Sequence, residues 1–215
     1  MVNLAAFAGG PVGRLRSSLG SGWRQSMADG ADLDDAELAR RAATGCRDSF
    51  ATLAMRYQIR IVHYVRQLAG RADRDNADDI AQEAFVRAWR AIGSYDSRWA
   101  FSTWLFTIAR RVCLNHARSA RRRRVRDTAG ASAAVTVADP SRAAVALERA
   151  TRLWDVAAAE LSEPQFSAVW LRYVEAKSPG EVAVVLGKPE ATVKVILFRA
   201  RRRLEPLVRD LLDWE

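Results

Sequence analysis

The sequence predicts an all-α protein built from two small helical domains, a helical bundle and a helix-turn-helix unit, joined by a flexible linker. Apolar residues recur at spacings of three and four along most of the chain, which is typical of amphipathic helices. Alanine and arginine are abundant while glycine is modest at 12 of 215 residues, and this composition favours helices. No stretch alternates apolar and polar residues as a strand does.

The chain divides into four expected parts. Residues 1–30 are rich in glycine and serine without sustained periodicity, so we expect a disordered extension. We then expect a first domain at 31–122, a linker of small residues at 123–145, and a second domain at 146–215. Met27 directly precedes an acidic helix start, so it is a candidate for the true translation start.

Four helices are predicted in the first domain, with a tight loop at 93–100 before the last of them. Their expected bounds are Asp32–Ala43, Arg47–Leu68, Asp75–Ile92, and 101 to about 122. Acidic residues at the first helix start and arginines at its end suit the helix dipole. Glycines at 45 and 70 follow the first two helices and predict their ends.

The second domain also reads as a series of helices. The first is expected at 146–159, and the second begins near Pro164 with Ser162 as a plausible N-cap. The second has an apolar stripe of Phe166, Val169, Trp170, Tyr173 and Val174. A short helix opens at Ser178-Pro179 with Val182, Ala183 and Leu186 buried, and a last helix opens at Pro189 with Val193, Ile196 or Leu197, Ala200 and Leu204 as core candidates.

The net charge of +9 is concentrated in two short blocks. Residues 110–126 hold eight arginines and no acid, and residues 188–205 have an excess of four positive charges. A polyanion such as nucleic acid is a natural partner for such blocks. Two solvated arginine faces would give the same composition.

The run "SPGEVAVVLGKPEATVKVILFRARRR" at 178–203 has the pattern of a helix-turn-helix. A short helix, a glycine turn and an arginine-rich helix follow one another, so the first helix would brace the second in the major groove of DNA. An ordinary helical hairpin is the alternative.

Aromatic residues gather at one end of the long basic helix. Core packing is the default interpretation for Trp104, Leu105 and Ile108, which have helical spacing. Tyr95 and Trp99 lie in or beside the loop, where we expect weaker demand from the core. Rings beside arginines also suit single-stranded nucleic acid, because exposed bases stack on rings while arginines hold phosphates.

Two sequence motifs resemble two regions of one protein family, in the same order along the chain. The stretch "DNADDIAQEAFVRAWRAIGSYDSRWAFSTWLFTIAR" resembles region 2 of bacterial extracytoplasmic-function (ECF) sigma factors. The matching positions are Asp78, Asp79, Gln82, Glu83, Phe85, Arg87, Trp89 and the triplet Thr103-Trp104-Leu105. The stretch "VWLRYVEAKSPGEVAVVLGKPEATVKVILFRARRRL" resembles region 4 of the same family. Together they cover about Asp32 to Val208.

The resemblance implies a non-catalytic specificity subunit that directs core RNA polymerase to promoters and opens the −10 element. It implies a pocket for a flipped-out base at Ser94, Tyr95 and Asp96. The wider set expected at the −10 element is Arg87, Ser94, Tyr95, Asp96, Trp99, Arg110, Arg111, Asn115 and Arg118. The set expected at the −35 element is Thr192, Lys194, Val195, Phe198, Arg199 and Arg202.

The resemblance also implies protein partners. Asp78, Asp79, Gln82 and Glu83 would dock on the clamp of the largest polymerase subunit, although acids at a helix start are also ordinary helix-dipole charges. Phe166, Trp170 and Leu207 would fill the second domain's core or meet the flap of the second-largest subunit. An anti-sigma factor is a further expected partner.

Several positions depart from the family pattern. The family commonly has Asn at Arg111, Asp at Asn115, Gly at Ala191, and Ser and Arg at Val195 and Ile196. Losing a polar reader and a phosphate contact would either weaken the generic affinity for DNA or shift the −35 preference toward contacts with thymine methyl groups. These departures leave open a sigma-like decoy or adaptor that does not open promoters, and a free-standing helix-turn-helix repressor is a third hypothesis.

An enzyme, a metal site and a cofactor are not expected. Cys46 and Cys113 make no CxxC, and two cysteines with two histidines cannot supply a structural zinc site of the usual spacing. His63 and His116 have no nucleophile at a suggestive spacing. No apolar run reaches the about 18 residues of a membrane span. The two cysteines lie far apart and make no CxxC, so we expect a protein of the reducing cytoplasm.

Overall fold

The computed structural model describes residues 33–69, 74–126 and 153–212, and within these ranges the regular structure is helical with no strand. This confirms the predicted all-α class. The N-terminal extension, with Met27, lies outside the described residues, as does most of the expected linker and the start of the helix expected at 146–159. The helices of these ranges include α3 (Asp35–Ala43), α4 (Arg47–Leu68), α5 (Ala77–Ala91), α6 (Phe101–Arg126), α8 (Glu163–Tyr173), α9 (Pro179–Leu186) and α10 (Glu190–Leu212).

Local sequence explains where α3 begins and ends. Asp34 is its N-cap, and its Oδ1 accepts a hydrogen bond from the backbone N–H of Glu37 at 2.7 Å. The helix therefore begins at Asp35 rather than at the expected Asp32. Gly45, at φ 98°, makes the turn into α4 because a left-handed conformation costs glycine little.

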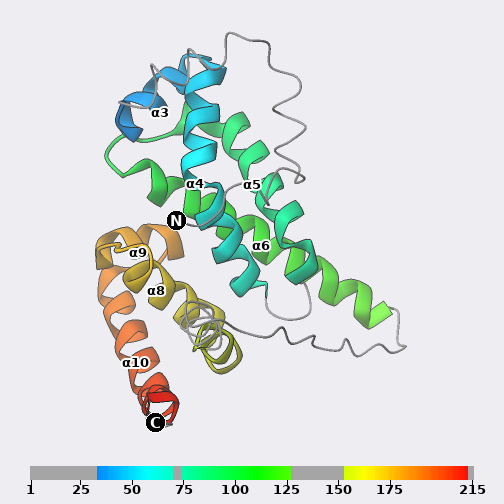
Figure 1. Ribbon diagram of the computed structural model, residues 1–215, viewed down its shortest axis with the longest axis vertical. Coiled ribbons are helices and arrows are strands. Elements are labelled where there is room, and N and C mark those ends of the chain that lie inside the picture. Colours follow the sequence, from blue (N-terminus) through cyan, green and yellow to red (C-terminus); the bar gives the residue numbers. More distant parts are fainter. Residues whose placement is uncertain (1–32, 70–73, 127–152, 213–215) are drawn as a thin grey trace, which may run out of the picture.

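Helices α3 to α6 form one packed group (Figure 1). Its centre is made by α4 and α6, where Ile61, Tyr64, Leu105 and Phe106 are fully buried. Tyr64 and Phe106 meet edge to face with ring centroids 5.2 Å apart. Phe106 was not among the expected core positions.

The boundaries of α5 and α6 differ from the expectation. The stretch expected as one helix from Asp75 to Ile92 is α5 flanked by two 3-10 turns, Arg74–Asn76 and Ile92–Ser94. Helix α6 runs to Arg126, beyond the expected end near 122, and its C-terminal part extends away from the other helices (Figure 1). Arginine is a good helix former, so the basic block continues the helix.

The C-terminal group contains a helical stretch at 153–160 and α8 to α10. Ser162 and Gln165 form a capping box at α8, and Ser178 and Glu181 form another at α9. Tyr173 and Val174 were expected in the core, but both are exposed where α8 ends. In α9 the fully buried positions are Val182, Val185 and Leu186, so Val185 takes the place expected for Ala183.

In the last helix Val193, Leu197 and Ala200 are buried, whereas Ile196 and Leu204 are only partly buried. The sequence left Ile196 and Leu197 as alternatives, and the structure buries Leu197.

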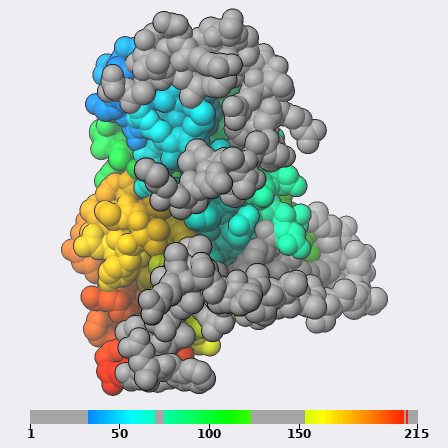
Figure 2. Space-filling view, viewed as in Figure 1, coloured from blue at the N-terminus to red at the C-terminus, as the bar shows by residue number. Residues whose placement is uncertain are grey.

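The two groups of helices lie against each other. Helix α8 contacts α4, and α9 contacts α6. In Figure 2 the yellow atoms of the C-terminal helices adjoin the cyan atoms of α4. No helix within the described ranges is long and apolar enough to cross a membrane.

Candidate nucleic-acid interface

Helix α9 braces α10 through a tight glycine turn. Gly187 adopts a left-handed conformation at φ 63° and ends α9. Val182, Val185 and Leu186 of α9 are buried, and α9 packs on α10, whose buried residues include Val193 and Leu197. This is the geometry of a helix-turn-helix, in which the first helix fixes the second and leaves its outer face free.

The outer face of α10 holds the residues predicted to read the −35 element. All six are exposed: Thr192, Lys194, Val195, Phe198, Arg199 and Arg202. Val195 is 47% exposed and Phe198 is 52% exposed, which is unusual for such apolar side chains. The Arg202 guanidinium lies 5.9 Å from the centre of the Phe198 ring. The face thus combines apolar and cationic groups, which suits thymine methyls and phosphates.

The loop before α6 is held together by its own hydrogen bonds. Ser94 Oγ donates to the Ala91 carbonyl at 2.7 Å, and Tyr95 Oη donates to the Trp99 carbonyl at 2.8 Å. Asp96 accepts from the backbone N–H of Arg98 at 3.0 Å and from its Nε at 2.8 Å. The side-chain hydrogen bond from Arg98 lowers the pKa of Asp96. The carboxylate therefore stays ionised within a preorganised loop.

Tyr95 and Trp99 have different surroundings in this loop. The Tyr95 ring packs edge to face on Phe101 and Trp104, with centroids 5.9 and 5.7 Å away, and this partial burial raises its pKa. The expectation that the core makes little demand on Tyr95 is therefore wrong. Trp99 is 36% exposed, so it is the ring in this loop that can offer a face to a base.

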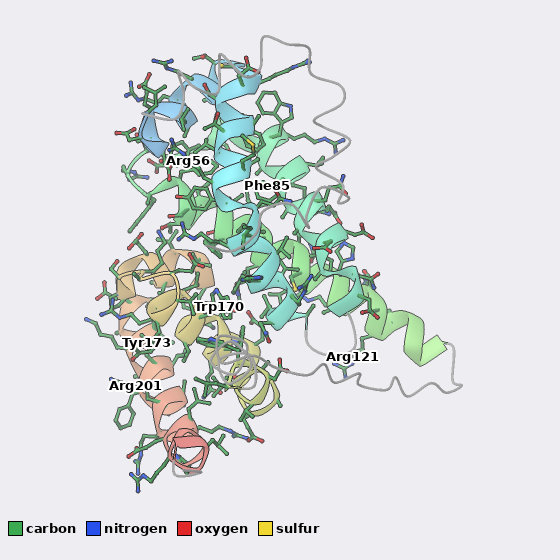
Figure 3. The ribbon with its side chains drawn as sticks, viewed as in Figure 1. Arg56, Phe85, Arg121, Trp170, Tyr173 and Arg201 are labelled. Carbon is green, nitrogen blue, oxygen red and sulfur yellow. The ribbon has the colours of Figure 1, made fainter. Side chains whose placement is uncertain are left out.

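The basic face of α6 is only partly free. Arg111, Asn115 and Arg118 are exposed, as expected for residues that meet DNA. Arg110 has a side chain that is only 12% exposed, because its guanidinium makes two hydrogen bonds to Glu163 of α8 at 2.7 and 2.8 Å. Figure 3 shows Arg121 near the projecting end of α6, away from this contact.

The acidic face of α5 is mostly exposed. Asp78, Asp79 and Gln82 are open to solvent, with Asp78 Oδ1 3.7 Å from Arg66. The Glu83 carboxylate is hydrogen-bonded to His116 of α6, and this bond lowers the pKa of Glu83.

Glu83 also pairs with Arg87, one turn further along α5. Arg87 is exposed, and its ion pair with Glu83 places its guanidinium at the surface between α5 and α6. The sequence did not predict His116 as the partner of Glu83, because the two are far apart in the chain and only the packing of α5 on α6 joins them.

The described residues contain no group of three or more His, Cys, Asp or Glu side chains that could hold a metal ion. In the described part of the chain Cys46 and Cys113 are not joined in a disulfide; Cys46 is exposed and Cys113 is buried.

Sequence reasoning also missed a set of polar residues between the two helical groups. Tyr64 Oη lies 2.9 Å from Ser167 Oγ, and Thr103 donates to Glu181 at 2.8 Å. Phe166 and Trp170 are buried in the core of the C-terminal group. Trp170 also approaches the Tyr64 ring at 6.2 Å, between the groups (Figure 3).

Two family models match the chain in the order that these surfaces follow. The model "Sigma-70 region 2" matches residues 53–123, which hold α5, the loop and α6. The model "Sigma-70, region 4" matches residues 152–204, which hold the helix-turn-helix. A helical protein with both surfaces is a sigma-type factor of transcription initiation.

Curated relatives make the assignment more specific. The chain is 32% identical over 190 residues to the RNA polymerase sigma-H factor of Pseudomonas aeruginosa, covering 82% of this chain and 96% of that one. It is 33% identical to the ECF RNA polymerase sigma factor BldN of Streptomyces coelicolor, covering 84% of this chain and 69% of that one. The chain belongs to the ECF family of RNA polymerase sigma factors.

Solved structures share the fold. The sigma factor RpoE in complex with the anti-sigma factor NepR from Bartonella quintana superposes with a TM-score of 0.60 at 24% identity, covering 77% of this chain and 98% of that one. CnrH in complex with the cytosolic domain of CnrY gives 0.59 at 23% identity, covering 82% and 97%. Both likenesses concern the arrangement of helices.

Proposed function

We propose that this chain works as a two-domain ECF sigma factor in the cytoplasm, without a cofactor. The first domain would span 31–126, because α6 runs to Arg126 rather than to the expected 122, and the second would span 146–215, with the linker between them. The second domain would place α10 in the −35 element, while the first would dock on core polymerase and hold the −10 element as a single strand.

The exposed face of α10 is the single observation that carries this proposal. An amphipathic helix of a free-standing bundle has no reason to present Val195 and Phe198 beside Arg199 and Arg202 to water. A major groove supplies thymine methyls for the apolar side chains and phosphates for the guanidinium groups. We therefore expect a −35 preference richer in thymine than Ser and Arg at Val195 and Ile196 would give.

At the −10 element we assign the roles by exposure. Trp99 would stack on an unpaired base, and the fixed loop of Ser94, Tyr95 and Asp96 would line the pocket of a flipped base. Arg111, Asn115 and Arg118 would contact the phosphates of the single strand, with Arg87 and Arg110 beside them.

The acidic face of α5 would bind the clamp of the largest polymerase subunit. Asp79 and Gln82 are exposed on the same helix as Val86, which is a further exposed apolar residue. Asp79→Asn and Gln82→Ala should each weaken core polymerase binding while leaving the helical content unchanged. Glu205→Gln, which removes an exposed acid from α10, is the matched control and should bind like the parent chain.

An anti-sigma factor is a proposed partner. In the two superposed structures RpoE is bound to the anti-sigma factor NepR, and CnrH is bound to the cytosolic domain of CnrY. These similarities support the proposal, because this chain has the same fold as the proteins that bind those partners. Purification of the tagged chain from its own cells, followed by identification of a stoichiometric partner that blocks transcription, tests this.

The deciding experiment is transcription from a pool of genomic fragments with purified protein and core polymerase. Discrete transcripts that depend on the protein, and disappear with Asp79→Asn, are the expected result. Tight binding to core polymerase without any transcript would indicate a decoy instead. A shift of duplex DNA by the chain alone, with steep salt dependence and no polymerase requirement, would indicate a repressor.

A further inference from the structure

Three polar side chains lie together at the surface where α5 packs on α6, and we call them the Glu83 cluster. Its members are Glu83 and Arg87 of α5 and His116 of α6. The exposed fractions of these side chains are 34%, 47% and 38%, so all three remain in contact with solvent. The cluster is therefore open to a ligand as well as to its own members.

Both carboxylate oxygens of Glu83 have partners within the chain. Glu83 Oε2 is hydrogen-bonded to Nε2 of His116, and Glu83 Oε1 lies 2.5 Å from Nη2 of Arg87. The hydrogen bond with His116 is the main cause of the lowered pKa of Glu83, so the carboxyl group is ionised near neutral pH. An ionised carboxylate only accepts hydrogen bonds, and His116 Nε2 therefore donates to it.

The contact with His116 differs in kind from the pair with Arg87. Glu83 and Arg87 are four residues apart on one helix, with the acid first, which is a favourable but weak arrangement on a helix surface. His116 comes from another helix, and the packing of α5 on α6 brings its ring to the carboxylate (Figure 1). The carboxylate is thus fixed from α6, and the guanidinium that pairs with it is fixed in turn.

A fixed guanidinium suits the role proposed for Arg87 at the −10 element. Arginine carries five N–H donors, so the ion pair through Nη2 leaves donors for a phosphate. A long side chain that is already held in place loses less conformational freedom when it binds its ligand. The position of Arg87 before DNA arrives should therefore contribute to the affinity for the strand.

We propose that His116 and Glu83 are positioning residues for the −10 strand: His116 fixes the Glu83 carboxylate, and this carboxylate holds the Arg87 guanidinium where a phosphate of the strand meets it. This inference rests on the proposed function, which places Arg87 at the −10 element. It gives Glu83 a different role from the contact with the polymerase clamp that the family resemblance implies. Asp79 and Gln82, which are exposed on α5, keep that role.

Strand binding is measured on the complex of the full-length chain with core polymerase. The probe is a labelled random-sequence single-stranded DNA pool, which is adequate because a phosphate contact does not depend on sequence, and core polymerase alone gives the baseline. His116→Ala should weaken binding by about threefold or more, because the strand must then immobilise Arg87 itself. His116→Gln should bind like the parent chain, because its amide nitrogen can still donate to Glu83. His63→Ala, which removes the other histidine, exposed on α4, is the matched control and should also bind like the parent chain.

Glu83→Ala gives a result whose sign separates position from charge. Removing a negative charge would by itself strengthen binding to a polyanion. Loss of the support for Arg87 should instead weaken binding of the pool. The affinity of a labelled Glu83→Ala chain for core polymerase should equal that of the parent chain, whereas Asp79→Asn should lower this affinity.

A double-substitution cycle tests whether His116 acts through Arg87. Arg87→Gln should weaken strand binding, and His116→Ala should have no further effect in that background, because the group that His116 positions is already gone. A purely structural role would weaken binding by the same factor in both backgrounds. Urea denaturation accompanies the cycle, and His116→Ala should leave the midpoint almost unchanged, because exposed ion pairs contribute little to stability.

Four results would overturn the inference. They are unchanged strand binding in His116→Ala, stronger strand binding in Glu83→Ala, an equal effect of His116→Ala with and without Arg87, and a loss of core polymerase affinity in Glu83→Ala with strand binding unchanged. The last of these would return Glu83 to the clamp.

Failure of the proposed function would give a different result. The complex of the parent chain would then bind the pool no better than core polymerase alone, and the inference would fall together with the proposed function. The expected effects of the variants without any promoter-dependent transcript would support the positioning role and remove promoter opening instead.

Discussion

Tyr95 and Trp99 lie four residues apart in one loop and have different roles. The Tyr95 ring packs on Phe101 and Trp104, and its hydroxyl holds the Trp99 carbonyl, so this side chain shapes the loop. The Trp99 ring is the more exposed of the two. Because the hydrogen bond uses the backbone of Trp99, its side chain can be removed without releasing the loop.

This difference gives a prediction for alanine substitutions. Tyr95→Ala should lower the free energy of unfolding by about 2 kcal/mol, somewhat below the cost for a fully buried ring. Trp99→Ala should change it by less than about 0.5 kcal/mol and still weaken promoter opening, because one stacked base is worth about 1–3 kcal/mol. Urea denaturation and transcription measure the two effects. Equal losses of stability in both variants would contradict the assignment.

The ionisation of Glu181 reports on the contact between α6 and α9. Burial acts to raise its pKa, but hydrogen bonds from Ser178, Lys177 and Thr103 outweigh burial and lower the pKa to about 2. A carboxyl group whose pKa is depressed by folding stabilises the native state above its ordinary pKa of 4.5, and this contribution is lost as the pH falls from about 4.5 toward 2.

Thr103→Val removes the donor that comes from the first group, so the pKa of Glu181 should rise above 2 while staying below 4.5. The loss of stability between pH 7 and pH 3 should shrink accordingly. Carboxyl carbon NMR titration measures the pKa. Thr107→Val is the control, because Thr107 Oγ1 bonds the Thr103 carbonyl within α6 and should leave the titration unchanged.

At the scale of elements, the turn between α9 and α10 depends on one glycine. Gly187 has φ 63°, and a Cβ added there would meet no atom within 4 Å, so the cost of a side chain is in the backbone alone. Gly187→Ala should therefore lower the free energy of unfolding by about 1 kcal/mol and weaken −35 binding. Gly93→Ala, in equally open space without a positive φ, should be close to neutral. Urea denaturation of both variants makes the comparison.

The sequence predicted helices well where local signals act alone. The bounds of α4 agree with the expectation, and the turn at Gly187 and the cap at Ser162 were both predicted from residue type. Tyr173 and Val174 were misplaced because helical spacing shows which residues share a face and cannot show where the neighbouring element stops covering it.

The sequence could not predict the polar contacts between the two groups of helices, for a different reason. Arg60 and Glu175 are 115 residues apart, and each looks like an ordinary surface charge in its own segment. The family resemblance placed Arg110 at the −10 element, and the basic block around it has no acid, whereas its partner Glu163 lies in another helix. Local periodicity and charge counts contain no information on such pairs.

At the scale of the whole molecule, the net charge of +9 is divided between surfaces with different roles. Glu163 of α8 covers Arg110, whereas the outer face of α10 is exposed. The arginines near the end of α6 lie where that helix extends past its neighbours (Figure 1). Positive charge alone therefore does not decide which groups contact DNA in a given state.

The salt dependence of promoter binding should separate positioning contacts from reading contacts on α10. Arg202→Gln should make the slope of log affinity against log salt concentration shallower by about 0.9, the value for one lost phosphate contact, with the order of preferred promoters unchanged. Val195→Ser should leave the slope unchanged and alter promoter preference at thymine positions, because the methyl groups of Val195 carry no charge.

Arg209→Gln is the control. Arg209 is also an exposed arginine further along α10, it pairs with Glu205 at 3.3 Å, and its substitution should change neither the slope nor the promoter preference. Titrations of the holoenzyme on a fixed set of promoter fragments at several salt concentrations measure both. A change of slope with Val195→Ser, or of promoter order with Arg202→Gln, would show that the two residues have the opposite roles.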